Sequence, residues 1–291
     1  MSRRGSIRRL RATYRNWLTL AFHLAVLSGP PPRVVLRDGT TLGPPARRGT
    51  VFALALARAS GWELRGEDGA FLTLVPRDGV RIVVRWREGF DVENALEVFL
   101  DRVYAADVRG KLVIDVGASV GDSALFFASE GARRVIALEP HPESFALARR
   151  NVERSPFSGR ITLLPVAAAR QDGTVQLRTP GSVPNAASLA PAPAAEARWA
   201  FDRTIAVAAR SLDALVLGSA PDGVGLLKLD VQGAEYDLVA SLSEAAWGLI
   251  DAIVLEFTDG PRGLPDLLRA HGFETSTSGG ERGYLRGTRS T

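Results

Sequence analysis

Apolar and polar residues alternate in a regular succession of blocks from about residue 106 onward. Two short β-branched runs, at 112–116 and 134–138, predict strands that are buried on both faces. Residues 123–131 between them carry apolar side chains at helical spacing and end in glycine, which predicts a helix. The same pattern predicts strands at 161–166, 174–178, 224–230, 251–256 and 284–285, and helices at 142–152, 234–242 and 265–270. Strands that alternate with helices require right-handed crossovers, so residues 106–291 are expected to form a doubly wound, mainly parallel α/β sheet.

Residues 33–105 follow a different pattern. Short apolar runs are broken by three Asp-Gly turns, and the runs at 71–75 and 80–86 flank one of these turns, which predicts a β-hairpin. Asp91 is a candidate N-cap for a helix that runs to Val103. We therefore expect a small β-rich N-terminal accessory domain with a linking helix, whose role is either structural support or cover for a substrate mouth.

Residues 1–32 combine arginines with a short apolar run at 17–27. A signal peptide is disfavoured because His23 interrupts the run and the prolines that follow give a poor cleavage site. The run is also too short to span a bilayer. We expect a basic N-terminal helix or tail that is either docked on the protein body or rests on an anionic membrane, and the general burial of apolar helix faces favours docking. The chain is accordingly predicted to be cytoplasmic, with peripheral membrane contact as the alternative.

The composition narrows the possible chemistry. None of the 291 residues is cysteine, so disulfides, thiolate metal sites and cysteine nucleophiles are excluded. The net charge of +4 and a pI of about 9.9 permit nucleic acid, anionic lipid or an anionic substrate as a partner. Six arginines before residue 16 supply much of this charge, so the pI does not by itself require a nucleic-acid groove.

The strand at 112–116 leads into a glycine turn that suits a bound ligand. Gly117 and Gly121 let a ligand approach the backbone, and the N–H groups that open the next helix face it. Glu139 ends the second strand and can accept hydrogen bonds from both hydroxyls of a ribose. The spacing differs from the G-x-G-x-x-G of dinucleotide folds, and Asp115 suits a cationic ligand, which together favour S-adenosylmethionine. The predicted cofactor-binding residues here are Asp115, Gly117, Ala118, Ser119, Gly121, Asp122, Ser123, Glu139 and Pro140. The alternative is a buried strand and loop without a ligand.

Carboxylates end the later strands at the same edge of the predicted sheet. Asp230 ends the strand at 224–230, where a general base for a hydroxyl nucleophile would sit. Glu235 follows in the first turn of the next helix, and Lys228 shares a strand face with Asp230 and could orient it. These three residues are candidate catalytic residues, and a structural Lys–carboxylate network is the alternative. Asp230, Glu235 and Glu256 could together hold Mg²⁺, but carboxylates often gather at strand ends without metal, so no metal site is predicted.

Three segments resemble the FkbM family of S-adenosylmethionine-dependent methyltransferases: 113–123, 131–140 and 227–235, which reads Leu-Lys-Leu-Asp-Val-Gln-Gly-Ala-Glu. The third segment is the most specific, and the similarity runs from about Glu97 to about Phe273. Gln232 stands where family members usually have Glu. The resemblance implies a Rossmann-like methyltransferase sheet, O-methylation of a hydroxyl on a sugar, glycan or similar small molecule, and a backbone contact from Ala167 near the adenine.

Two other functions stay open. The net positive charge suggests an RNA methyltransferase. However, amino-methyltransferases that act on flipped bases usually carry Asn/Asp-Pro-Pro-aromatic at the position where residues 230–233 read Asp-Val-Gln-Gly. Gln232 in place of an acid suggests a cofactor-binding module without activity. Residues 179–195 are rich in Pro, Ala, Gly and Ser and predict either a linker or a mobile lid.

Overall fold

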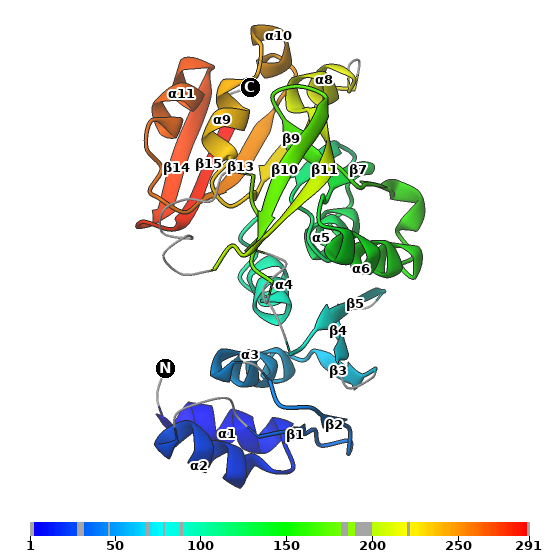
Figure 1. Ribbon diagram of the computed structural model, residues 1–291, viewed down its shortest axis with the longest axis vertical. Coiled ribbons are helices and arrows are strands. Elements are labelled where there is room, and N and C mark those ends of the chain that lie inside the picture. Colours follow the sequence, from blue (N-terminus) through cyan, green and yellow to red (C-terminus); the bar gives the residue numbers. More distant parts are fainter. Residues whose placement is uncertain are drawn as a thin grey trace. The chain divides into compact units, whose positions relative to one another are not determined.

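The computed structural model describes residues 3–27, 32–45, 47–67, 70–77, 79–87, 90–181, 186–189, 200–219 and 222–289. The chain divides into two compact units (Figure 1). The N-terminal unit comprises residues 1–102 with 154–156, and the larger unit comprises residues 103–153 with 157–291. Most of the predicted linker or lid at 179–195 lies outside the described residues, as do parts of the predicted Asp-Gly turns at 68–69 and 78–79.

A seven-stranded sheet forms the centre of the larger unit, with the strand order β14-β15-β13-β12-β6-β7-β8. The strands are β6 (Leu112–Val116), β7 (Arg134–Leu138), β8 (Ile161–Leu164), β12 (Leu226–Leu229), β13 (Ala252–Phe257), β14 (Phe273–Gly279) and β15 (Gly283–Arg289). The first five pair in parallel, whereas β15 runs antiparallel to β13 and β14. The predicted doubly wound, mainly parallel sheet is therefore confirmed.

Helices connect the parallel strands as the alternating pattern predicts. They are α5 (Asp122–Ser129), α6 (Pro142–Glu153), α8 (Leu212–Leu217), α9 (Glu235–Ala240), α10 (Glu244–Trp247) and α11 (Leu264–Ala270), with the 3₁₀ turn η1 at Ser158–Arg160. All five residues of β6 are buried, which is why its sequence is continuously apolar apart from Asp115. The core joins Ile114, Leu227 and Ile253 of the strands to Leu238 and Leu268 of the helices.

A second, three-stranded sheet adjoins this core, and Figure 1 shows its two long strands as a ribbon beside the central sheet. β10 (Gly173–Thr179) pairs antiparallel with β11 (Arg203–Ser211), and β11 pairs in parallel with the short β9 (Ala167–Ala169). The sequence pattern predicts β10 but not β11. Alanine is a poor strand former, and β11 is rich in it, so pairing with β10 rather than intrinsic propensity accounts for this strand.

The N-terminal unit mixes helices and strands. Its elements are α1 (Arg3–Thr13), α2 (Trp17–Val26), β1 (Val34–Val35), β2 (Thr41–Leu42), α3 (Arg48–Ala59), β3 (Glu63–Gly66), β4 (Phe71–Arg77), β5 (Val80–Arg85) and α4 (Asp91–Phe99). The predicted hairpin is present as the antiparallel pair β4–β5. Within the described ranges no helix is both long and apolar enough to cross a membrane.

Helix α3 corrects the sequence prediction, which places only strands and turns between residues 33 and 90. Six of its residues are buried: Thr50, Val51, Ala53, Leu54, Ala55 and Ala57. Alanine and leucine are strong helix formers, so the apolar positions here belong to a helix rather than to a strand. Helix α4 also ends earlier than predicted, at Phe99 rather than Val103.

Candidate functional site

The glycine turn lies where β6 ends, over the end of the neighbouring strand β7. The backbone N–H groups of Gly117 and Ala118 both donate to the carbonyl of Leu138, at 3.0 and 2.9 Å. Gly117 and Gly121 have φ of +80° and +83°, and Ser119 between them also has a positive φ, of +47°. The turn therefore depends on left-handed backbone that glycine adopts without strain, and α5 begins directly after it.

Gly117 has a structural reason to lack a side chain, in addition to the predicted approach of a ligand. A Cβ at this position would lie 1.9 Å from the carbonyl oxygen of Asp230 and 3.0 Å from its carbonyl carbon. The close neighbour of Gly117 is thus the backbone that follows β12, and not only a ligand. The backbone N–H of Asp230 in turn donates to the carbonyl of Val116, at 3.1 Å. The turn and the predicted base are therefore in contact at the junction of two parallel strands.

Glu139 is placed beside the glycine turn, as the sequence predicts for a residue that ends β7. Its buried carboxylate accepts hydrogen bonds from the backbone N–H groups of Ser119 and His141, both at 2.8 Å. The hydroxyl oxygen of Ser119 is buried and has no hydrogen-bond partner among the described residues. A carboxylate acceptor, an unsatisfied hydroxyl and the N–H groups at the start of a helix form a polar set that fits a nucleoside with a polar tail.

Three of the remaining predicted cofactor residues are buried. Asp122 and Ser123 are buried in the first turn of α5, Pro140 follows Glu139, and Ala167 is buried in β9. Their role in cofactor binding stays a prediction.

Lys228 is predicted to orient Asp230, but it pairs instead with Asp115. Its ammonium lies 3.0 Å from a carboxylate oxygen of Asp115, and both side chains are fully buried. The ammonium also donates to the carbonyls of Val116 and Gly117, at 3.2 and 2.7 Å, and the Ser123 hydroxyl donates to Asp115 at 2.7 Å. Burial lowers the pKa of Lys228, but the Asp115 and Asp230 carboxylates outweigh it, so the pKa is raised and the ammonium keeps its charge. Asp115 and Lys228 thus form a buried ion pair beneath the glycine turn.

The carboxylate of Asp230 is held by one donor on each oxygen. The Tyr104 hydroxyl donates to Oδ2 at 2.9 Å, and the Gln232 amide donates to Oδ1 at 2.8 Å. Tyr104 packs edge-on against Tyr284, with ring centroids 5.8 Å apart. Burial and the nearby Asp230 carboxylate raise the pKa of the Tyr104 phenol well above its ordinary value, so the phenol stays protonated and remains a donor. A carboxylate oxygen has two lone-pair sites, so each oxygen of Asp230 retains one further acceptor position.

Glu235 lies in the first turn of α9, as the sequence predicts. Its side chain is fully buried, and its oxygens accept from the backbone N–H groups of Val231 and Gly233, at 3.1 and 2.8 Å. Burial raises the pKa of Glu235 from 4.5 to about 7. Glu256 is also buried and pairs with Arg282. In the described part of the chain, no group of three His, Cys, Asp or Glu residues is placed to hold a metal ion.

The contacts of Asp230 with Tyr104 and Gln232 are not predicted from the sequence. Tyr104 precedes β6 in a segment without a motif, and only the fold brings it to a residue 126 positions away in the chain. Gln232 stands out in the sequence because the resembled family usually has Glu at this position. Its contact with Asp230, however, is made from a backbone with a positive φ of +56°, which the sequence does not indicate.

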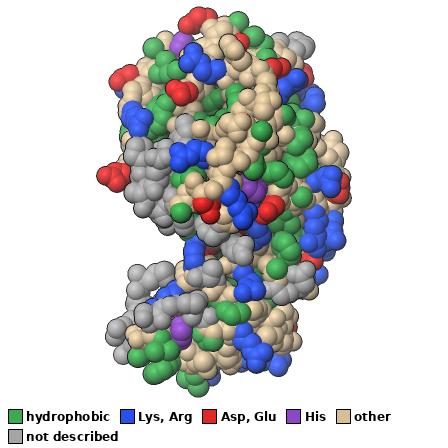
Figure 2. All heavy atoms as spheres, viewed as in Figure 1, with side chains coloured by type: hydrophobic (Ala, Val, Ile, Leu, Met, Phe, Trp, Pro, Cys, Tyr) green, Lys and Arg blue, Asp and Glu red, His purple; other side chains and the backbone are tan. Residues whose placement is uncertain are grey.

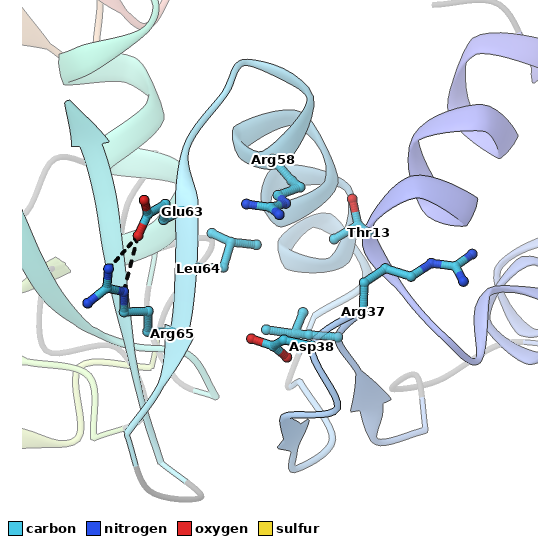
Figure 3. Close-up of a pocket in the computed structure, with 8 residues that line it drawn as sticks. Thr13, Arg37, Asp38, Arg58, Glu63, Leu64 and Arg65 are labelled. Atoms are coloured by element: carbon cyan, nitrogen blue, oxygen red, sulfur yellow. Dashed lines mark hydrogen bonds and ion pairs between the residues drawn. The ribbon is translucent and has the colours of Figure 1, made fainter. Parts of the chain in front are cut away.

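A separate pocket lies within the N-terminal unit (Figure 3). It has a volume of about 310 Å³ and is lined by Thr13, Leu36, Arg37, Asp38, Arg58, Glu63, Leu64 and Arg65. Arg65 pairs with Glu63 at 2.6 Å, and the Arg37 guanidinium donates to the carbonyl of Arg11 at 2.9 Å. None of the predicted site residues lines this pocket, so it is distinct from the candidate site.

The chain is similar to known methyltransferases over the region that contains this site. A family described as "Methyltransferase FkbM domain" matches residues 115–275. The 31-O-demethyl-FK506 methyltransferase FkbM of Streptomyces tacrolimicus is 30% identical over 212 residues, which cover 61% of this chain and 79% of the relative. Methyltransferase 1 of Beauveria bassiana is 26% identical over 179 residues, which cover 56% and 72%. Among solved structures, methyltransferase FkbM from Methylobacillus flagellatus is similar with a TM-score of 0.46 and 14% identity, over 84% of this chain and 56% of that one.

Proposed function

The chain belongs to the FkbM methyltransferase family, and from this premise we propose that it transfers a methyl group from S-adenosylmethionine to a hydroxyl of a sugar, glycan or similar small molecule. The observation that carries the proposal is the Asp230 carboxylate, which two donors hold at the end of β12 beside the glycine turn of β6. The name of the Streptomyces relative, a 31-O-demethyl-FK506 methyltransferase, supports an oxygen acceptor.

The residues around the glycine turn would hold the cofactor. Glu139, which accepts from the N–H groups of Ser119 and His141, would bind the ribose hydroxyls. The unsatisfied Ser119 hydroxyl would offer a further polar contact, and Ala167 would supply an apolar neighbour. Bound S-adenosylmethionine supplies a methyl group that is activated by its sulfonium. The buried pair of Asp115 and Lys228 fixes the turn, since Lys228 also binds the carbonyls of Val116 and Gly117.

Asp230 serves as the general base in this proposal. An aliphatic hydroxyl is a poor nucleophile, so it would need to lose its proton as its oxygen bonds to the methyl carbon, whose bond to sulfur would break to release S-adenosylhomocysteine. That proton passes to a carboxylate oxygen of Asp230. Tyr104 and Gln232 hold the carboxylate in one orientation, which limits the reorganisation required during the reaction. Glu235 supports the site indirectly, because it binds the backbone of the loop that carries Gln232.

The proposal is tested by a screen of sugars, glycans, lipids and RNAs with methyl-labelled cofactor, followed by Asp230→Asn on the best acceptor. General-base catalysis contributes about 10²–10⁴-fold, so turnover should fall by that factor while calorimetry shows little change in cofactor affinity. Asp237→Asn, on an exposed position of α9, is the matched control and should keep full activity. Methylation of RNA alone would refute the proposed hydroxyl acceptor. Cofactor binding without turnover on any acceptor would indicate a non-catalytic module.

A further inference from the structure

Helix α2 exposes a continuous apolar stripe. Leu18, Phe22 and Val26 follow one another at intervals of four residues and therefore share one face of the helix. Their side chains are 66%, 60% and 64% exposed, whereas Leu20 is fully buried. Figure 2 shows hydrophobic side chains gathered at the end of the N-terminal unit where Figure 1 places α2. Large apolar residues exposed together, rather than singly, mark an interaction surface.

Polar contacts at both ends hold α2 in this orientation. The Asn16 amide, just before the helix, donates to the carbonyl of Arg33 at 2.9 Å and accepts from the N–H of Val35 at 3.0 Å. At the other end the guanidinium of Arg48 donates to the carbonyl of Leu27 at 2.8 Å and also to that of Leu24. The apolar stripe thus belongs to a helix that is fastened to its unit, which makes its outward direction a property of the fold.

The sequence segment that contains this helix carries charge of a single sign. Residues 1–37 contain eight arginines and no acidic residue, whereas the 254 residues that follow contain 28 basic and 32 acidic ones. Five of these arginines have exposed side chains: Arg8, Arg11, Arg15, Arg33 and Arg37. A surface that combines exposed apolar side chains with an excess of positive charge is complementary to a layer that offers hydrocarbon beneath anionic headgroups.

We propose that the exposed face of α2, with the surrounding arginines, binds the surface of a membrane that contains anionic lipid. A helix of ten residues is about 15 Å long, half of the hydrocarbon thickness of a bilayer, so α2 lies in the interface and does not cross it. Leu18, Phe22 and Val26 enter the boundary between headgroups and acyl chains, and the arginines bind the phosphates. A nucleic acid would use the arginines but would leave the apolar stripe exposed. The proposal is independent of the proposed methyl transfer.

Flotation of the full-length chain with lipid vesicles tests this surface. The chain should bind vesicles of phosphatidylcholine mixed with phosphatidylserine, and it should bind pure phosphatidylcholine at least tenfold more weakly. Leu18→Ser with Phe22→Ser should weaken binding to the mixed vesicles by a factor of ten or more, because both apolar contacts are lost. Arg8→Gln with Arg11→Gln should weaken it by about thirtyfold, since each arginine near an anionic surface contributes about fivefold.

Matched controls separate this surface from general effects of charge and apolarity. Leu100→Ser with Leu217→Ser removes two exposed apolar side chains elsewhere, and Arg81→Gln with Arg160→Gln removes two exposed arginines elsewhere. Both controls should bind vesicles like the unmodified chain, and circular dichroism should show all variants to be folded. Absence of binding to mixed vesicles overturns the proposal, and so does binding that the Leu18 and Phe22 substitutions leave unchanged. It is also overturned if those substitutions abolish self-association in sedimentation velocity, or if the Arg8 and Arg11 substitutions weaken RNA binding, while vesicles are not bound.

Discussion

At the scale of single residues, the distinctive feature is that Asp230 receives a neutral amide donor from Gln232, where a glutamate is usual in the resembled family. A glutamate could not donate this hydrogen bond and would place a second negative charge beside the carboxylate. Like charges at hydrogen-bond distance disfavour the ionisation of both groups. We therefore expect Gln232→Glu to reduce turnover at neutral pH and to shift the acidic limb of kcat/KM to higher pH.

Tyr104→Phe complements the Gln232→Glu test because it removes the second hydrogen-bond donor to the Asp230 carboxylate without adding charge. It should lower kcat by about tenfold, the effect of losing one hydrogen bond to a charged group. A pH profile that is the same for the Gln232→Glu variant and the unmodified chain would show that the amide does not set the ionisation of the base.

Glu139 carries the prediction for cofactor binding. Glu139→Ala removes an acceptor that is expected to bind the ribose, and charge-assisted hydrogen bonds of this kind contribute about 2–3 kcal/mol. Calorimetry with S-adenosylmethionine should show a loss of affinity of that size in the folded variant. Glu139 also binds the N–H groups of Ser119 and His141, so Glu139→Gln, which keeps one acceptor oxygen, is the control for the shape of the turn. Unchanged affinity in the alanine variant would remove Glu139 from the site.

The sequence predicts which residues lie at the site better than it predicts their hydrogen-bond and ion-pair partners. Strand ends and glycine spacing place Gly117, Glu139 and Asp230 at one edge of the sheet. Strand alternation gives the face on which Lys228 lies, but it does not say which carboxylate the ammonium reaches, and the pairing of β12 with β6 sets it opposite Asp115. The contact of Tyr104 with Asp230 depends on tertiary structure alone, so no local pattern could predict it.

At the scale of elements, the connection from β12 to α9 contains the buried Glu235, whose pKa of about 7 makes stability depend on pH. A carboxyl group whose pKa is higher in the folded than in the unfolded chain binds a proton on folding between the two values. Its contribution to stability is thus greatest below pH 4.5 and falls as the pH rises to about 7. Glu235→Gln does not titrate. The free energy of unfolding of the unmodified chain should therefore fall relative to this variant by about 3 kcal/mol across the interval.

Urea unfolding of both proteins at a series of pH values across this interval measures the difference. Asp237→Asn, which changes an exposed carboxylate on the same helix, should show no such trend. The difference in the free energy of unfolding between the Glu235→Gln variant and the unmodified chain could instead stay constant with pH. In that case Glu235 is ionised across the whole interval, and its two backbone hydrogen bonds stabilise the carboxylate by more than burial destabilises it.

Helices and strands can be predicted from the sequence where the local pattern of apolar residues matches the burial of the element in the fold. β6 and β12 are buried at every residue and β13 at all but its first, so their mainly apolar runs identify them from the sequence. β11 gains its strand conformation from a seven-residue pairing with β10, which its alanines do not indicate. α3 follows a short hairpin-like stretch, and its mixture of Thr, Val, Ala and Leu suits both kinds of element, so only packing decides between them.

At the scale of the whole molecule, the two units have separate cores, and the arginine-rich segment belongs to one of them. Leu10 and Tyr14 are buried, and the Tyr14 hydroxyl donates to the carbonyl of Val51 in α3 at 2.7 Å. Helix α1 is therefore a packed part of the N-terminal unit and not only a charged tail. The glycine turn, Glu139 and Asp230 all belong to the larger unit, whose sheet has its own core.

This division leads to opposite expectations for the two units when residues 1–15 are removed. The N-terminal unit loses the buried side chains of Leu10 and Tyr14, a change that costs several kcal/mol, so scanning calorimetry should show its transition at a lower temperature or absent. The larger unit should unfold as before, and titration with S-adenosylmethionine should give an unchanged affinity, because no residue predicted to bind the cofactor has been touched. Tyr14→Phe is the milder form of the same test, since it breaks one buried hydrogen bond and should cost about 1–2 kcal/mol in the first transition only. A loss of cofactor affinity in a truncated chain whose larger unit still unfolds at its usual temperature would mean that the arginine segment contributes to the methyltransferase site itself.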